Sequence, residues 1–281
     1  MPRLKLTLAY VSTRYHGWQI QAWKDREDPP TVQAFVEKAV SHVAGRSTHV
    51  QGAGRTDAGV HADAQVAHCD IPEDRAHVRW QLALNTLLPH DIRVLDARIV
   101  PDSFDACFSV KRKAYTYSLW LDSLYTPPRL YPFVWACGPF DLDLFDAAVP
   151  HLVGTHDFAS LQNAGTPHKS TVRTLYAITR SPARTPEAAL PPGCRQIDVR
   201  FEANGFLKQM VRNLVGLMVA CGRGRFDPER IPELLASGDR RLAPFTAPPQ
   251  GLTMSRIWYE NESPGVSLPV PETSQDPTDK D

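Results

Sequence analysis

Residues 48–68, THVQGAGRTDAGVHADAQVAH, predict two strands joined by a glycine-rich loop. The loop, residues 52–62, holds a single acid, Asp57, among small, flexible or basic residues. Gly54 and Gly59 let the backbone turn tightly there and let a ligand approach closely. A tight turn alone explains most Asp residues in such a setting. An acid held in place for chemistry is the alternative, and the loop by itself leaves both interpretations open.

The elements that flank this loop follow the order β-α-β-β-α-β. Apolar residues spaced i, i+3, i+4 and i+7 predict a helix that Thr31 caps and Gly45 ends. Alternating leucines predict the first strand. The predicted strands cover about residues 4–10, 48–53, 64–68 and 92–100, and the predicted helices cover 32–44 and 78–88.

From about residue 113 the same order recurs. Strands are predicted over 114–120, 172–180, 195–203 and 254–260, and helices over 141–154, 205–221 and a short stretch after Asp227-Pro228. Pro150 should kink the first of these helices, and the second should start after Asn204 and end at Gly222. No sequence identity links the two halves. Element order alone predicts an α+β fold of two ferredoxin-like or RRM-like halves with mainly antiparallel sheets.

At 281 residues the chain is long enough for one large core or two smaller ones. We expect an N-terminal α+β domain over 1–105, a C-terminal α+β domain over 106–262 and a tail over 263–281. The tail combines prolines and acids with few apolar residues, so we expect it to be disordered. A hydrophobic content of 42% and a charged content of 22% are typical of soluble globular proteins.

Targeting features and cysteine usage suggest a cytoplasmic location. No N-terminal apolar run resembles a signal peptide, and no uncharged apolar stretch is long enough to span a bilayer. The five cysteines are odd in number and form no CxxC pair. We therefore expect reduced thiols rather than a disulfide framework or a zinc site.

The formal net charge is zero, but the charge is unevenly distributed along the chain. Residues 259–281 contain six acids and one lysine, which leaves residues 1–258 with 30 basic and 25 acidic residues, a net charge of +5. Residues 203–226 contain four cations and no acid, and residues 111–117, KRKAYTY, interleave three cations with two tyrosines. Such local basic surface is typical of polyanion binding, although a solvated face explains each run as well.

Two alternative sites receive little support from the motifs. The loop fits only part of the dinucleotide fingerprint G-x-G-x-x-G, because Asp57 stands where the third glycine belongs, and no P-loop lysine pattern is found. His61, Asp63 and His68 raise the question of a metal site, but an extended segment places His68 on the face opposite the other two. We interpret these three as ordinary polar strand residues.

The segment GRTDAGVHA (54–62) resembles the signature loop of the TruA-type tRNA pseudouridine synthase family. The resemblance extends over roughly residues 3–260. Further similar stretches are YHGWQIQ (15–21), TVQ (31–33), FSVKRKAYTY (108–117), GTHDFAS (154–160), TVRTLY (171–176), NGFLKQMVRNLVG (204–216) and DRRLAPFTAPPQGL (239–252).

Three positions depart from the family pattern. Val11-Ser12 replace an Asp-Gly pair, FDAC (104–107) stands where Phe-His-Ala-Arg is common, and Met254 occupies a frequent leucine position. None of them touches the acid. Cys107 in place of an arginine does call the local RNA contacts into question.

The resemblance implies the pseudouridine synthase fold, with the two halves around a central cleft. It also implies an isomerase that breaks the N1–C1′ glycosidic bond of a tRNA uridine, rotates the base and rejoins it through C5. The family's substrates are uridines 38, 39 and 40 in the anticodon arm. We accordingly expect tRNA as the partner, no cofactor, no metal and a homodimer that grips tRNA across both subunits.

The resemblance also assigns roles to four residues. Asp57 matches the catalytic acid, which attacks as a nucleophile either the uracil ring or the ribose carbon. Arg212 matches an arginine that orients this carboxylate, and Tyr115 matches a tyrosine that stacks on the target base. Arg55 is expected to hold a phosphate near the everted nucleotide. Without the resemblance, these would be a turn acid, a helix-surface cation, a strand aromatic and an exposed loop arginine.

Two other functions are weighed against this one. A non-catalytic RNA-binding protein of tandem RRM-like units should carry the aromatic RNP pattern on a central strand, which is not found in this sequence. A metal-dependent hydrolase should be inhibited by a chelator, whereas an isomerase of this family should not.

Overall fold

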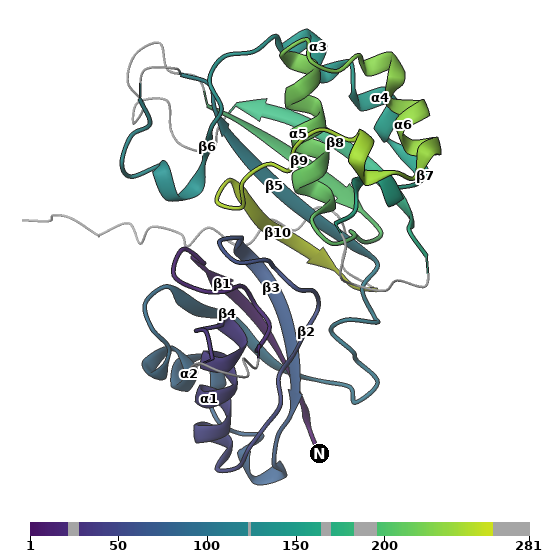
Figure 1. Cartoon of the computed structure of the whole chain (residues 1–281). Coiled ribbons are helices and arrows are strands. Elements are labelled where there is room, and N and C mark those ends of the chain that lie inside the picture. The colour runs from purple at the N-terminus through teal and green to yellow at the C-terminus, as the bar shows by residue number, and fades with distance from the viewer. Residues whose placement is uncertain (22–27, 123–124, 164–169, 183–195, 261–281) are drawn as a thin grey trace, which may run out of the picture.

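The computed structural model describes residues 1–21, 28–122, 125–163, 170–182 and 196–260. The strands form a single ten-stranded sheet, and the helices lie beside it (Figure 1). The strands are β1 (Arg3–Tyr10), β2 (Gln51–Gly52), β3 (His61–Asp70), β4 (Ile92–Val100), β5 (Arg112–Trp120), β6 (Trp135–Ala136), β7 (Gly154–Asp157), β8 (Val172–Pro182), β9 (Gln196–Ala203) and β10 (Leu252–Trp258). The helices are α1 (Val32–Ala44), α2 (Trp80–Leu87), α3 (Leu142–Asp146), α4 (Val149–Leu152), α5 (Met210–Gly222) and α6 (Ile231–Ser237).

The N-terminal half has the predicted order β1-α1-β2-β3-α2-β4. β1 pairs antiparallel with both β3 and β4, and it buries its alternate leucines as the sequence predicts. Helix α1 ends at Gly45, whose φ of 72° is in the left-handed region that favours glycine. The predicted cap is wrong in one respect: the Thr31 hydroxyl makes no capping bond and lies buried without a partner among the described residues. β2 is also shorter than expected, with only two residues.

The C-terminal half departs from its predicted elements at three places. The helix expected over 141–154 is two short helices, α3 and α4, and the interruption precedes Pro150, which occupies the first turn of α4. The end of that predicted helix instead enters β7, which pairs antiparallel with β8. Helix α5 begins at Met210 rather than just after Asn204, so residues 205–209 form a loop.

The two halves join through a short parallel contact between β3 and β10. Only Thr253 with His61 and Met254 with Ala62 are paired there, whereas β10 pairs antiparallel with β5 along most of its length. The resulting order is β4-β1-β3-β10-β5-β9-β8-β7, with β2 on β3 and β6 on β5. Antiparallel pairs predominate, which confirms the predicted α+β architecture.

This register places side chains of both halves on one face of the sheet. Tyr10 is paired with Ala62, Ala62 with Met254, and Met254 with Tyr115, and laterally paired residues point to the same side. The tyrosine of the first strand therefore faces the same side as the tyrosine of β5. The pocket described below, which Tyr115 lines, lies on this face.

Two expectations about the chain's organisation remain outside this description. The division into domains at residues 105 and 106 stays a prediction, and the tail over 263–281, which is expected to be disordered, lies outside the described residues. Among the residues described, no helix is both long and apolar enough to cross a membrane.

Candidate active site

Contacts with other segments of the N-terminal half fix the loop between β2 and β3, residues 53–60. The Trp18 backbone N–H donates to the Thr56 carbonyl at 3.1 Å, and the Thr56 hydroxyl bonds the Tyr10 hydroxyl at 2.8 Å. Gly17 has a φ of 85°, and a Cβ there would lie 2.4 Å from the Thr56 oxygen. Only glycine lets the chain pass so close. Asp57 is therefore presented by a rigid backbone rather than by a free turn.

Asp57 meets Arg212 from helix α5. The Arg212 Nη1 donates to the Asp57 Oδ2 at 3.3 Å, with the guanidinium side chain 13% exposed and the carboxylate side chain 33% exposed. The Arg212 Nε donates to the Ala247 carbonyl at 2.7 Å. One guanidinium thus connects the loop to the segment that follows α6. Because it is held at two points, it fixes the direction of the carboxylate.

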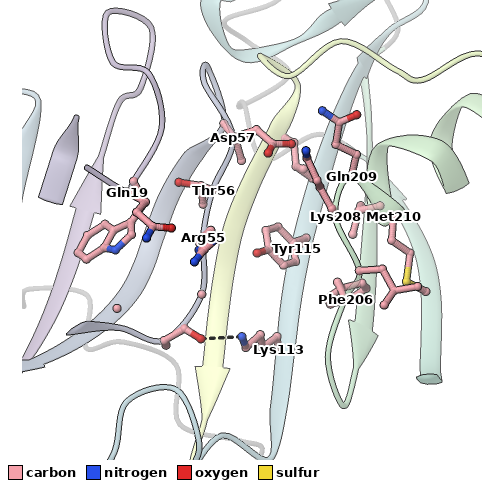
Figure 2. Close-up of a pocket in the computed structure, with 18 of the residues that line it drawn as sticks. Gln19, Arg55, Thr56, Asp57, Lys113, Tyr115, Phe206, Lys208, Gln209 and Met210 are labelled. Atoms are coloured by element: carbon pink, nitrogen blue, oxygen red, sulfur yellow. Dashed lines mark hydrogen bonds between the residues drawn. The ribbon is translucent and has the colours of Figure 1, made fainter. Parts of the chain in front are cut away.

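Tyr115 lies on β5 beside this pair, with its side chain almost fully buried. Its ring contacts the Phe206 ring edge-on, with ring centres 5.1 Å apart and planes at 88°. Burial, followed by the nearby Tyr10 hydroxyl and the Asp57 charge, raises the pKa of Tyr115, so the phenol stays neutral. Figure 2 shows the tyrosine ring below the Asp57 carboxylate, between the loop that carries Arg55 and the Phe206 ring.

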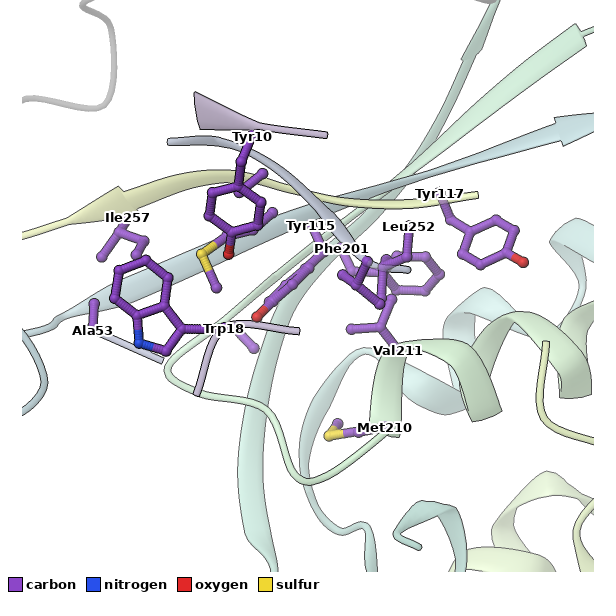
Figure 3. Packing of buried hydrophobic residues seen from close by; sticks show 14 of the residues in the cluster. Tyr10, Trp18, Ala53, Tyr115, Tyr117, Phe201, Met210, Val211, Leu252 and Ile257 are labelled. Atoms are coloured by element: carbon purple, nitrogen blue, oxygen red, sulfur yellow. The ribbon is translucent and has the colours of Figure 1, made fainter. Parts of the chain in front are cut away.

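Buried side chains from both halves support the Tyr115 ring. Figure 3 places it among Tyr10, Phe201 and Leu252, which come from three different strands. Tyr10 in turn stacks on Trp18 with ring centres 6.1 Å apart. The hydrophobic core thus continues across the junction and forms the floor of the site.

Asp57, Tyr115 and Arg212 line a pocket of about 690 Å³. The loop with Arg55 and Asp57 forms one wall, and the stretch from Phe206 to Arg212 forms the other (Figure 2). A volume of this size is ordinary for a small-molecule site and has room for one nucleoside. The structure therefore brings Asp57, Tyr115 and Arg212 together from segments far apart in the sequence.

Arg55 belongs to the same pocket but is placed differently. Its side chain is exposed, and no hydrogen bond or ion pair holds it within the part of the chain that the structure describes. Cys107, one of the three departures from the family pattern, also lines the pocket. The exposed guanidinium is available to a ligand at the rim.

Sequence reasoning missed a lysine beneath the loop. The Lys113 Nζ donates to the Ala53 carbonyl at 2.8 Å, and burial lowers the pKa of Lys113. A Cβ on Gly54 would lie 2.9 Å from the same nitrogen. The segment KRKAYTY drew attention for its cations, but its pattern gives no sign that one of them bonds a backbone carbonyl 60 residues away.

The sequence also did not predict that residues 206–210 form a wall of the pocket. Phe206, Lys208 and Gln209 line the pocket, and all three were predicted to lie on a helix. The only available signal was the resemblance of residues 204–216 to a family stretch. That resemblance pointed to Arg212 and not to the loop before it.

The two histidines considered for a metal site make protein contacts instead. The His61 Nδ1 accepts from the Ser12 N–H at 3.0 Å, so Nε2 is the donor to the Pro132 carbonyl at 2.8 Å. Burial lowers the pKa of His61. The His68 Nδ1 accepts from the Ala106 N–H at 3.1 Å. Among the described residues, no three His, Cys, Asp or Glu side chains are grouped so that they could hold a metal ion.

Comparison with known proteins adds to this geometry. Residues 11–109 and 148–260 match a family described as tRNA pseudouridine synthase. The chain is 51% identical over 259 residues to the tRNA pseudouridine synthase A of Lawsonia intracellularis, a match that covers 92% of this chain and 100% of that protein. It is 48% identical to the protein of the same name from Nitratidesulfovibrio vulgaris, with the same coverage of both chains. With Coxiella burnetii tRNA pseudouridine synthase A it shares 36% identity, over 96% of each chain. The extent of these matches, which include the Asp57 loop and helix α5, shows that this chain belongs to the tRNA pseudouridine synthase family.

Proposed function

We propose that Asp57 is the nucleophile with which this enzyme, an isomerase, converts uridine in tRNA to pseudouridine. The observation that carries the proposal is the pairing of Asp57 with Arg212 at 3.3 Å in a pocket shared with Tyr115. Isomerisation breaks the N1–C1′ bond and forms a C5–C1′ bond between the same base and sugar. It needs no redox partner and no group donor.

Two routes of attack remain compatible with this arrangement. The carboxylate adds either to the uracil ring or to the ribose C1′, and each route requires an ionised acid held at a fixed angle. Arg212 fixes the orientation of the carboxylate. Its second hydrogen bond, to the Ala247 carbonyl, keeps the guanidinium in place. The partial exposure of Asp57 leaves the carboxylate accessible from the pocket.

The remaining pocket residues suit an everted nucleotide. A base taken out of its helix loses its stacking neighbours, and an aromatic ring in the site replaces them. Tyr115 offers such a ring, already fixed by its edge contact with Phe206. Arg55 is exposed at the rim, and in this proposal it bonds a phosphate of the same RNA strand.

Similarity to the TruA-type enzymes supports the finer assignments. We propose that the targets are uridines 38, 39 and 40 of the anticodon stem-loop, that the enzyme acts as a homodimer, and that it works in the cytoplasm. The net charge of +5 over residues 1–258 is consistent with a polyanionic substrate.

Tritium release tests the proposed substrate positions. When uridine carries tritium at C5, formation of the C5–C1′ bond expels that tritium to water. We expect the enzyme to release tritium from tRNAs with uridine at 38, 39 or 40, and to release none from the same tRNAs with cytidine at those three positions. Equal release from both sets would refute the assignment of positions, and no release from any tRNA would refute the isomerase itself.

The stacking role of Tyr115 predicts a graded effect on binding. Stacking of a base on an aromatic ring contributes roughly 1–3 kcal/mol, so Tyr115→Ala should weaken tRNA binding by about tenfold or more. Tyr115→Phe keeps the ring and should bind far better than Tyr115→Ala. Filter binding measures the tRNA affinity of both variants. Tyr131→Ala, a change at an exposed tyrosine away from the pocket lining, provides the control. Equal affinities for the Phe and Ala variants would argue against stacking.

A further inference from the structure

The segment after α6 determines where Arg212 lies. We call residues 243–251 the strap. Its Ala247 N–H donates to the Arg212 carbonyl at 3.1 Å, and its Ala247 carbonyl accepts from the Arg212 Nε at 2.7 Å. The strap also lies directly on α5, because a Cβ on Gly216 would stand 1.9 Å from the Phe245 oxygen. A shift of the strap would therefore move the guanidinium that meets Asp57.

Arg240, just before the strap, fixes its path through several hydrogen bonds. Its Nη1 donates to the carbonyls of Ala243 at 3.2 Å and Pro244 at 2.9 Å. Its Nη2 donates to the Thr246 hydroxyl at 2.9 Å. A planar guanidinium with five N–H donors can bond three points of a bent segment at once, which a lysine cannot.

The same guanidinium also bonds the protein beneath the strap. Its Nε donates to the Asn163 side-chain oxygen at 3.1 Å, and its Nη2 donates to the Asn213 side-chain oxygen at 3.0 Å. Asn213 lies on α5, one residue after Arg212, and is almost fully buried. All these acceptors are neutral oxygens, and burial lowers the pKa of Arg240. A cation kept in such surroundings is costly unless its donors are satisfied.

A second branch of the network reaches the pocket wall. The Asn163 side-chain N–H donates to the Gln209 side-chain oxygen. Gln209 lines the pocket and has a φ of 60°, in the left-handed region that non-glycine residues rarely occupy. A strained backbone of this kind persists only where its surroundings hold it. Arg240 helps to hold this conformation, because it bonds the Asn163 side chain that in turn bonds Gln209.

We propose that Arg240 is a positioning residue for the isomerisation: it sets the strap that aims Arg212 at Asp57, and it sets Asn163, which holds Gln209 at the pocket wall. Arg240 does not line the pocket, so it acts through residues that do. The proposal rests on the function proposed above for Asp57 and Arg212. It explains why an arginine lies here although the described residues include no carboxylate paired with it.

Single-turnover tritium release from uridine-labelled tRNA tests this proposal. Arg240→Gln should lower the rate constant at saturating enzyme by about 100-fold, since misplacement of a reacting group by about 1 Å has an effect of that order. The half-saturating enzyme concentration should change by less than about threefold, because binding surfaces at the rim are untouched. Arg240→Lys keeps the positive charge and some of the N–H donors. Its rate constant should therefore be about tenfold higher than that of Arg240→Gln.

Arg241→Gln is the matched control. Arg241 is the adjacent arginine, its side chain is 90% exposed, and its partner is Asp239. It should retain the parent rate constant. Thermal melting of each variant shows whether the fold is kept. The proposal would be overturned if Arg240→Gln had the rate constant of the parent enzyme. It would also be overturned if the variant changed only the half-saturating enzyme concentration.

A double-mutant cycle separates this proposal from the function on which it depends. In an Arg212→Lys background, Arg240→Gln should lower the single-turnover rate constant by less than about threefold further. Both changes disturb the same contact, and such effects are not additive. A full 100-fold additional loss would show that Arg240 does not act through Arg212, and would overturn the part of the proposal in which the strap positions Arg212. If Asp57→Asn still turned over, the proposed nucleophile itself would fail, whatever the outcome of the cycle.

Discussion

Replacement of Asp57 by asparagine is expected to abolish turnover while tRNA binding persists. The amide has nearly the shape of the carboxylate, and its oxygen still accepts from the Arg212 Nη1, so the loop and the pocket should remain as they are. An amide is a far weaker nucleophile than a carboxylate. We expect the single-turnover rate of tritium release to fall by roughly 10⁴-fold or more, as with the removal of other enzymic nucleophiles.

Filter binding of the Asp57→Asn variant completes this experiment. Its affinity for tRNA should lie within about threefold of the parent enzyme, because the change removes chemistry and not contact area. Asp63→Asn is the control, since Asp63 is an exposed acid on β3 that does not line the pocket. If Asp57→Asn turned over at the parent rate, Asp57 would have no part in the chemistry.

Arg212→Met should have the second largest effect. The change leaves the Asp57 carboxylate without its cation and the Ala247 carbonyl without the Nε donor. The rate of tritium release should fall by about 10³-fold, the scale expected when an enzyme loses one preorganised electrostatic partner. The free energy of unfolding should drop by roughly 1–3 kcal/mol, because a buried acceptor loses its hydrogen bond. Urea denaturation measures this second quantity.

Arg212→Lys distinguishes charge from geometry in this experiment. A lysine keeps the positive charge, but a single ammonium cannot bond the Ala247 carbonyl and the Asp57 carboxylate in the way a fork does. Its activity should lie between those of the parent enzyme and Arg212→Met. Parent-like activity in the lysine variant would show that only the charge matters. Parent-like activity in the methionine variant would show that the ion pair is dispensable.

Where periodicity is strong, the sequence predicted the fold well. β1 and α1 follow from alternating or helical apolar spacing and occupy nearly their expected ranges, whereas β3 extends beyond the expected 64–68 at both ends. The start of α5 was missed because Phe206 and Leu207 continue the apolar pattern of the helix upstream. In the structure Gln209 takes a left-handed conformation, and those two apolar residues line the pocket instead. Tertiary packing outweighed the local pattern there.

All four expected site residues, Arg55 included, line one pocket, and their roles remain proposals. Asp57, Tyr115 and Arg212 were identified through the resemblance to a family, because no local pattern distinguishes a nucleophile from a turn acid. Lys113 and Arg240 were not found, since each acts on backbone or side chains far away in the sequence. A single sequence does not encode such partners in any short window, and the fold has to be known before they can be seen.

The insertion of β10 between β3 and β5 has a consequence for biosynthesis. The strand that joins the two halves is made long after the Asp57 loop and after Tyr115. Each half can bury much of its own apolar surface earlier, but pairings so distant in sequence form late. A nascent polypeptide that stops short of Leu252 contains Asp57 and Tyr115 yet lacks the strand that lies between β3 and β5. We therefore expect isomerase activity only in chains whose translation has passed that point.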